Sequence, residues 1–216
     1  MPSGYACAMQ IRKIGIGAAL LLGVGAIIVG YASYAALQKH AQQRRVAALV
    51  SDSTIKLRDA LGAPTPDLVA ALDANLKATH ASRDPALADA AEHYIIGARE
   101  ITRRLVAVRF IEREAAASRA ALTGHMAHSA RRSDAWLRDA IELKKRVERQ
   151  HYDLDLTLKG LDDLLFTMPA AEKQLEPRVG AAALLAPTVL DATRKQLQAD
   201  SQRANAELLK VRQLVP

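Results

Sequence analysis

Cysteine and aromatic residues are scarce in this sequence. Cys7 is the only cysteine among 216 residues, so no disulfide can form within the chain. Cys7 also precedes the long apolar segment, which does not fit a lipoprotein attachment site. Aromatic residues make up 4% of the chain and are scattered. Proteins that bind single-stranded nucleic acids stack bases on clustered aromatic rings, so we do not expect this class.

Catalytic and metal-binding motifs are also missing. The sequence contains neither a Gly-x-Ser-x-Gly nucleophile elbow nor a phosphate-binding glycine loop. One Glu-x-x-His step, Glu148 to His151, is too few for a di-iron carboxylate site, which needs two such steps and two further glutamates. His125 and His128 share a helix face but have no third ligand nearby. We therefore predict no enzyme activity, no metal and no cofactor.

Four aspartates need a separate interpretation, because paired carboxylates can perform acid–base catalysis. They are Asp153, Asp155, Asp162 and Asp163. They alternate with leucines in a helical pattern, which is typical of the solvated face of a helix.

An uncharged apolar segment is the strongest positive signal. Residues 14–37 carry no charged side chain, and at about 1.5 Å per residue such a helix reaches about 36 Å, enough to cross a hydrocarbon layer of about 30 Å. Tyr31 and Tyr34 lie near its end, where aromatic rings favour lipid headgroups. We predict a short basic tail over residues 1–13, a transmembrane helix over 14–37 and a soluble helical body over 38–216.

Basic residues flank this segment on both sides, so the positive-inside comparison does not fix its orientation. The candidates for contacts with lipid headgroups are Arg12, Lys13, Lys39, Arg44 and Arg45. The tail is tiny and has no acidic residue, and the body lacks cysteine. We therefore expect a single-pass signal anchor in a bacterial inner membrane, with a cytoplasmic tail and a periplasmic body.

Two further interpretations concern the same segment. Gly30-Tyr31-Ala32 and Ser33-Tyr34-Ala35 have the small-x-small pattern of cleavage sites, so processing would release a secreted helical protein. The apolar region exceeds the roughly 7–15 residues of a signal-peptide core, which favours retention. Small residues at four-residue spacing are candidates for packing against another membrane helix, although glycine and alanine are common in membrane helices in any case. They are Gly15, Ala19, Gly23, Ala26 and Gly30.

The body shows the start and stop signals of an all-α protein. Expected helix starts are Thr65-Pro66, Asp84-Pro85, Ser133 and Thr188, and expected breaks are Gly62, Pro64, Pro169, Pro177, Gly180 and Pro187. The expected helices cover residues 38–61, 66–79, 85–126, 133–168 and 188–214. Residues 128–133 are expected to form a turn between the two longest helices.

Apolar residues recur every seven positions in three of these helices. The three series are Leu87, Tyr94, Ile101, Val108, Ala115 and Leu122; Ala140, Val147, Leu154, Leu161 and Met168; and Leu190, Leu197, Ala204 and Val211. In the first helix, one face holds Val46, Val50, Leu57 and Leu61. The pattern predicts an N-terminal transmembrane helix followed by an antiparallel helical bundle or an elongated coiled-coil hairpin, without strands.

The net charge of +7 points first to solubility and to anionic membrane surfaces, and the arrangement of the basic residues does not favour nucleic acid. Basic residues of the two longest helices are interleaved with glutamates at short helical spacing, which indicates ion pairs on a solvated face. The basic residues are Arg99, Arg103, Arg104, Arg109, Arg113, Lys144, Lys145, Arg146 and Arg149, and the glutamates are Glu100, Glu112, Glu114, Glu142 and Glu148.

An anchor followed by apolar seams without catalytic chemistry predicts a membrane-tethered interaction, scaffold or spacer protein of the cell envelope. Its expected partners are the lipid bilayer and either another protein or a second copy of the chain. An alternative is an accessory ligand-binding or sensing domain. Such receptors usually return through a second membrane helix to an output module, and the sequence shows neither, so sensing takes second place.

Overall fold

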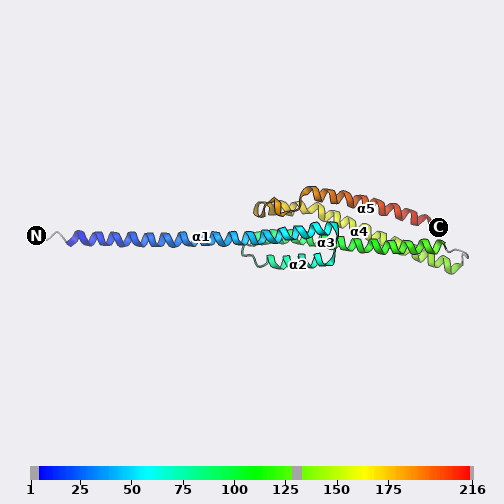
Figure 1. Cartoon of the computed structure of the whole chain (residues 1–216), viewed down its shortest axis with the longest axis horizontal. Coiled ribbons are helices and arrows are strands. Elements are labelled where there is room, and N and C mark those ends of the chain that lie inside the picture. Colours follow the sequence, from blue (N-terminus) through cyan, green and yellow to red (C-terminus); the bar gives the residue numbers. More distant parts are fainter. Residues whose placement is uncertain (1–4, 128–132, 215–216) are drawn as a thin grey trace. The chain divides into compact units, whose positions relative to one another are not determined.

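The computed structural model describes residues 5–127 and 133–214, without the side chains of residues 5–30, 32, 35 and 214. The described residues form helices and contain no strand, which confirms the predicted all-α class (Figure 1). The elements are α1 (Tyr5–Gly62), α2 (Pro66–Thr79), α3 (Pro85–Ala127), α4 (Asp134–Val179), the 3₁₀ helix η1 (Ala181–Ala183) and α5 (Pro187–Leu214).

The chain divides into two compact units, residues 1–44 and residues 45–216. Helix α1 contributes residues to both units, and the helices α2 to α5 belong to the second. The second unit, residues 45–216, is called the bundle below. Among the described residues, no helix is both long and apolar enough to cross a membrane. The side chains of residues 14–30, 32 and 35, which make up most of the predicted membrane segment, lie outside the described part of the chain.

Side chains next to prolines and at turns define the helix starts, as predicted. Asp84 accepts a hydrogen bond from the backbone N–H of Leu87 at 3.1 Å, and Ser133 accepts one from the backbone N–H of Trp136 at 3.2 Å. Both bonds satisfy N–H groups that have no partner inside the helix. Thr65 has the extended backbone of a cap but makes no side-chain capping bond.

Helices α3 and α4 form an antiparallel hairpin, which confirms that prediction. Near one end Arg119 lies beside His151, and near the other the Cβ position of Gly97 is 3.0 Å from the sulfur of Met168. A larger side chain at Gly97 would displace that methionine, so this glycine allows the close approach of the two helices. The residues expected to form the turn, 128–132, lie outside the described residues.

The core of the bundle follows the predicted seven-residue series. All members of the α3 and α4 series are buried, as are Leu190, Leu197 and Val211 of α5, while Ala204 packs partly buried against the core. From α1, the core receives Val46, Val50 and Leu57. Helix α5 runs antiparallel to α4, because Arg194 pairs with Asp162 and Arg212 pairs with Glu148.

Two predicted boundaries are wrong. Helix α4 does not end at Met168 but continues through Pro169 and Pro177 to Val179. A proline inside a helix costs about 3 kcal/mol, and the continued burial of Glu172 and Leu175 along the same seam shows that packing offsets this cost. Gly180, with φ of 86°, then ends the helix in a conformation that side chains disfavour.

The second wrong boundary is the start of the last helix. Helix α5 begins at Pro187, so Thr188 lies in its first turn and is not the residue before the helix. Proline is well suited to the first helical position, because its missing N–H would have no partner there. The residues before it, Leu184 and Leu185, are buried in the core.

Candidate functional site

The predicted Glu148–His151 step does not form a joint site. His151 is 4% exposed, and Nη1 of Arg119 lies 3.3 Å from its Nε2. Burial and then the charge of Arg119 lower the pKa of His151, so the ring is neutral and its Nε2 accepts the guanidinium proton. Glu148 pairs instead with Arg212 at 3.5 Å. Across the described part of the chain, no group of three or more His, Cys, Asp or Glu side chains is placed to hold a metal ion.

His125 has a packing role at the end of the hairpin where α3 ends and α4 begins. Its ring stacks on Trp136, with centroids 5.2 Å apart, and its Nε2 lies 2.9 Å from the carbonyl oxygen of Trp136. The indole N–H of Trp136 in turn donates to the carbonyl of His125 at 3.3 Å. These contacts tie the end of α3 to the start of α4. The second predicted histidine, His128, lies outside the described residues.

The four aspartates do not converge on one site. Asp155 pairs with Lys159 at 2.6 Å, and Asp162 pairs with Arg194 on α5 at 2.8 Å. Asp153 and Asp163 are exposed. The carboxylates therefore lie on a solvated face of α4, as the sequence predicted.

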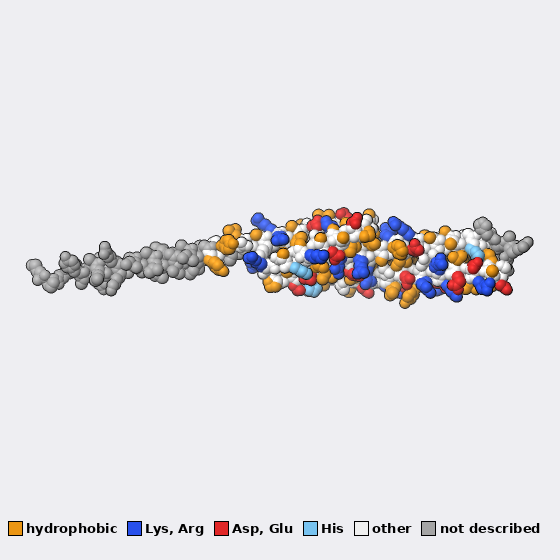
Figure 2. Space-filling view, turned by 90° about the horizontal axis from the view of Figure 1, so that it is seen from below, with side chains coloured by type: hydrophobic (Ala, Val, Ile, Leu, Met, Phe, Trp, Pro, Cys, Tyr) orange, Lys and Arg blue, Asp and Glu red, His pale blue; other side chains and the backbone are white. Residues whose placement is uncertain are grey.

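The basic residues of α3 and α4 are interleaved with acids (Figure 2). Pairs within one helix join Arg104 to Glu100 at 3.3 Å, Arg109 to Glu112 at 3.3 Å and Lys145 to Glu142 at 2.9 Å. Arg99 differs, because it reaches Asp73 on α2 at 3.0 Å. The mixed signs confirm the predicted ion pairs on a solvated face.

A chain of hydrogen bonds links three segments inside the bundle. The hydroxyl of Thr54 on α1 lies 2.7 Å from the carbonyl oxygen of Ala183 in η1 and 2.6 Å from the hydroxyl of Tyr94 on α3. A carbonyl can only accept, so Thr54 donates to Ala183 and Tyr94 donates to Thr54. Burial raises the pKa of Tyr94 to about 12, so its hydroxyl keeps the proton for this bond.

Glu172 of α4 is buried close to this chain. It is 7% exposed, and its Oε1 has no hydrogen-bond partner among the described residues. Burial raises its pKa to about 7, and the backbone N–H of Leu185 only partly compensates. Tyr94 is close enough to sense the charge of Glu172. An apolar core thus holds a carboxyl group that changes charge near neutral pH.

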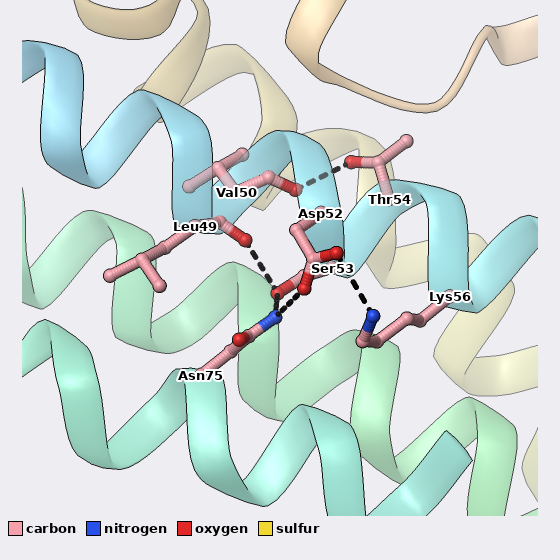
Figure 3. Close-up of polar contacts among 7 residues, drawn as sticks. All are labelled: Leu49, Val50, Asp52, Ser53, Thr54, Lys56 and Asn75. Carbon is pink, nitrogen blue, oxygen red and sulfur yellow. Dashed lines mark hydrogen bonds and ion pairs between the residues drawn. The ribbon is translucent and has the colours of Figure 1, made fainter.

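A second polar cluster joins α1 to α2 (Figure 3). The side-chain amide of Asn75 on α2 donates to the carboxylate of Asp52 at 2.7 Å and to the hydroxyl of Ser53 at 2.9 Å. Lys56 donates to the other oxygen of Asp52 at 2.9 Å. The bonds from Asn75 and then Lys56 lower the pKa of Asp52, so its charge is stable. This cluster fixes the register of α2 on α1.

A small cleft opens between α3, α4 and α5. Its volume is about 170 Å³. Its apolar side is formed by Ala115, Leu154 and Ala204, where two short alanines replace the larger side chains of the seam. Its charged rim consists of Glu112, Arg119, Asp200, Arg203 and Glu207. Such a cleft has the size and mixed polarity for a small zwitterion.

Large apolar side chains are exposed on the outer face of α4. Tyr152 is 67% exposed, Leu156 59% and Phe166 69%, and Phe166 lies under the guanidinium of Arg194. The outer stripe is defined here as Tyr152, Leu156, Lys159, Asp163, Phe166 and Ala170, all of which are exposed. Two aromatic rings and a leucine are therefore exposed along one face of α4, with the charged Lys159 and Asp163 between them.

The predicted membrane-related residues are described only in part. Lys39, Arg44 and Arg45 are exposed, as contacts with lipid headgroups require. The other candidates have side chains outside the described part of the chain. They are Arg12, Lys13, Gly15, Ala19, Gly23, Ala26 and Gly30.

Sequence reasoning missed Glu172 and the outer stripe. Glu172 was hidden by the expected break at Pro169, although it follows Met168 by one helical turn and so continues the apolar seam. The outer stripe escaped notice because two charged residues, Lys159 and Asp163, stand at its centre. No protein-family model matches the chain, and no match was found among curated proteins or solved structures. The geometry of these sites is therefore the basis for their function.

Proposed function

We propose that this chain is a single-pass membrane-tethered helical protein that acts as a non-enzymatic interaction, scaffold or spacer component of a bacterial envelope. The tether would be residues 14–37, which carry no charge. Helix α1 begins at Tyr5 and ends at Gly62, so the same helix contains this segment and the bundle residues Val46, Val50 and Leu57.

One observation carries the interaction role: the exposure of Tyr152, Leu156 and Phe166 along one face of α4. Burying each such side chain would contribute roughly 1.5–3 kcal/mol, which is not gained while the face remains in water. The other exposed charged side chains of α4 near the stripe include both signs, for example Asp153 and Lys173, so the apolar residues of the stripe are the part of α4 best suited to a protein partner.

Site-specific cross-linking tests this role. A photoreactive amino acid at Leu156, in the full chain within membranes, should give adducts of higher mass. Leu209 of α5 is the matched control, because it is 58% exposed against 59% for Leu156 but belongs to a different helix. Equal or absent adducts at the two positions would contradict the proposed interaction surface.

The orientation of the body is tested by reporter fusions. A periplasmic body predicts that alkaline phosphatase fused after Pro216 and after Asp52 is active, because this enzyme needs an oxidising compartment. A cytoplasmic body predicts inactive fusions at both sites. Sequencing of the mature N-terminus separates the tethered form from the secreted alternative, which would begin near Ser33 or Ala36.

A second candidate function, ligand binding, is favoured by the cleft around Arg119. The guanidinium of Arg119 contacts the neutral ring of His151, so its charge can still bind a carboxylate. Glu207 on α5 already holds the ammonium group of Lys210 at 2.8 Å, and an ammonium group of a ligand would bind there in place of Lys210. Free amino acids at millimolar concentration should then raise the melting temperature of the chain, and Arg119→Met should abolish the effect. A panel of amino acids without any such shift would remove this candidate.

A further inference from the structure

We infer that the outer stripe of α4 pairs with the same stripe of a second copy of this chain, and that the two α4 helices run antiparallel. This inference rests on the proposed interaction role and names its partner. The inference starts from α4, which has two rows of residues at heptad spacing. The bundle buries only one of these rows. Leu154, Leu158, Leu161 and Leu165 are buried in the core, and the outer stripe lies on the opposite face.

The spacing of the outer stripe is that of a coiled-coil seam. From Tyr152 to Ala170, its residues alternate in steps of four and three, which is the spacing of positions a and d of a heptad. Helices with this pattern bury the seam against a partner helix with the same spacing. A second copy offers that spacing by definition, so the surface can be complementary to itself.

The charges at the centre of the stripe select the antiparallel direction. In an antiparallel pair, position a of one helix faces position d of the other. Lys159 then lies opposite Asp163 of the second copy, and Leu156 lies opposite Phe166 of the second copy. Tyr152 lies opposite Ala170 of the second copy, where a large side chain meets a small one. Every layer of the stripe therefore has a complementary partner in charge or in size.

A parallel pair has no such complementarity. It would place the two copies of Lys159 opposite each other, and likewise the two copies of Asp163. Both layers would be repulsive, and the cost of like charges grows as the seam excludes water. The charge pattern thus opposes a parallel pairing of two copies through the outer stripe.

Charged groups next to the stripe fit the same arrangement. Asp162 is neutralised by Arg194 of its own chain at 2.8 Å, so it does not oppose a second copy. Lys159 holds Asp155 of its own chain at 2.6 Å and is 72% exposed at its side chain, so it can also reach an acid across the seam. Beyond the stripe, Arg149 would face Lys173 of the second copy, which limits the seam to residues 152–170.

The consequence is a symmetric pair of bundles that point in opposite directions. Residues 45–62 of α1 run parallel to α3, and α4 runs antiparallel to α3. Residues 45–62 of α1 and α4 therefore run antiparallel to each other. Two antiparallel α4 helices therefore send the Arg45 ends of the two bundles in opposite directions.

Disulfide cross-linking tests the register and direction. In full-length protein with Cys7→Ser, the double variant Leu156→Cys/Phe166→Cys should form a covalent dimer on mild oxidation in detergent solution. Each single variant alone should stay monomeric, because residues 156 of the two copies would be about 15 Å apart along the helix axis. A mixture of the two single variants should give the covalent dimer. A disulfide between two copies of Leu156→Cys would show a parallel pair and overturn the inference, as would no cross-link in any sample.

A charge exchange separates a direct contact from a general effect on folding. Lys159→Glu alone and Asp163→Lys alone each turn two attractive pairs into repulsive ones, and each should lower the yield of the covalent dimer on the order of tenfold. The combined Lys159→Glu/Asp163→Lys variant restores opposite charges and should recover the yield. Failure of the combined variant to recover it, with helix content unchanged by circular dichroism, would overturn the inference.

The outcomes also distinguish this inference from the proposed function. Photo-adducts at Leu156 with a different protein, together with no disulfide between copies, would retain the interaction role and reject the second copy as partner. A chain without adducts or disulfides would contradict both.

Discussion

Replacing Glu172 by glutamine should remove most of the pH dependence of bundle stability between pH 4.5 and 7. The carboxyl group of Glu172 has a pKa of about 7 in the folded chain, against 4.5 for an ordinary glutamate. The folded chain therefore binds this proton more tightly than the unfolded chain does. The stabilisation is fully present below pH 4.5, falls as the pH rises, and is lost once the pH exceeds about 7.

The size of the effect follows from the two pKa values. One pKa unit corresponds to about 1.4 kcal/mol, so the free energy of unfolding should fall by about 3 kcal/mol between pH 4.5 and pH 7 because of this one group. Glutamine has nearly the same shape but no charge, so Glu172→Gln should not show this decrease. The N–H groups of its amide, in place of the unpaired Oε1, would lack an acceptor among the described residues and cost about 1–3 kcal/mol at every pH, which shifts the whole curve without changing its slope.

The assay is urea unfolding of the full chain in mild detergent, followed by circular dichroism at pH values from 4.5 to 8.5. The difference in unfolding free energy, variant minus wild type, should rise by about 3 kcal/mol across this range. Glu176→Gln is the control, because Glu176 is an exposed neighbour on the same helix. Parallel pH curves for wild type and Glu172→Gln would refute the reasoning.

The remaining predictions concern other buried groups. His151 has a lowered pKa in the folded chain, so it should destabilise the bundle as the pH falls below its unfolded value near 6.5; His151→Leu should remove this acid-side loss in the same urea series. Thr54→Val should cost about 1–3 kcal/mol, because Tyr94 and Ala183 would each lose a buried partner, and Thr54→Ser should restore most of it. Leu161→Ala, at a fully buried seam position, should cost about 2–5 kcal/mol, whereas a cost below 1 kcal/mol would contradict its place in the core.

The sequence predicted most of the helices because their signals are local. A capping residue followed by proline, at Thr65 and at Asp84, marked the starts of two helices to within one residue. The seven-residue series marked the core face of each long helix. These signals depend on side-chain spacing along one helix, which the fold cannot change.

The boundaries that failed depend on tertiary packing. Pro169 and Pro177 are strong local signals against a helix, but the apolar seam of α4 continues past them and the core holds the helix together. Glu172 was missed for the same reason, since its burial depends on Tyr94 of α3 and on the segment around Leu185, which lie beside it only in the folded chain. The hydrogen bond between Thr54 and Tyr94 joins residues 40 positions apart, and no sequence pattern marks such a pair.

The central claim is that residues 14–37 hold the chain permanently in a bilayer, and alkaline carbonate extraction of membranes tests it most directly. A tag at the N-terminus and mass spectrometry of the recovered chain establish whether that end is intact. We predict that the full-length chain remains in the membrane pellet with its N-terminus intact, while a chain beginning at residue 38 is found in the supernatant. Recovery of the intact chain in the supernatant would contradict the claim, as would a mature protein that begins near Ser33 or Ala36.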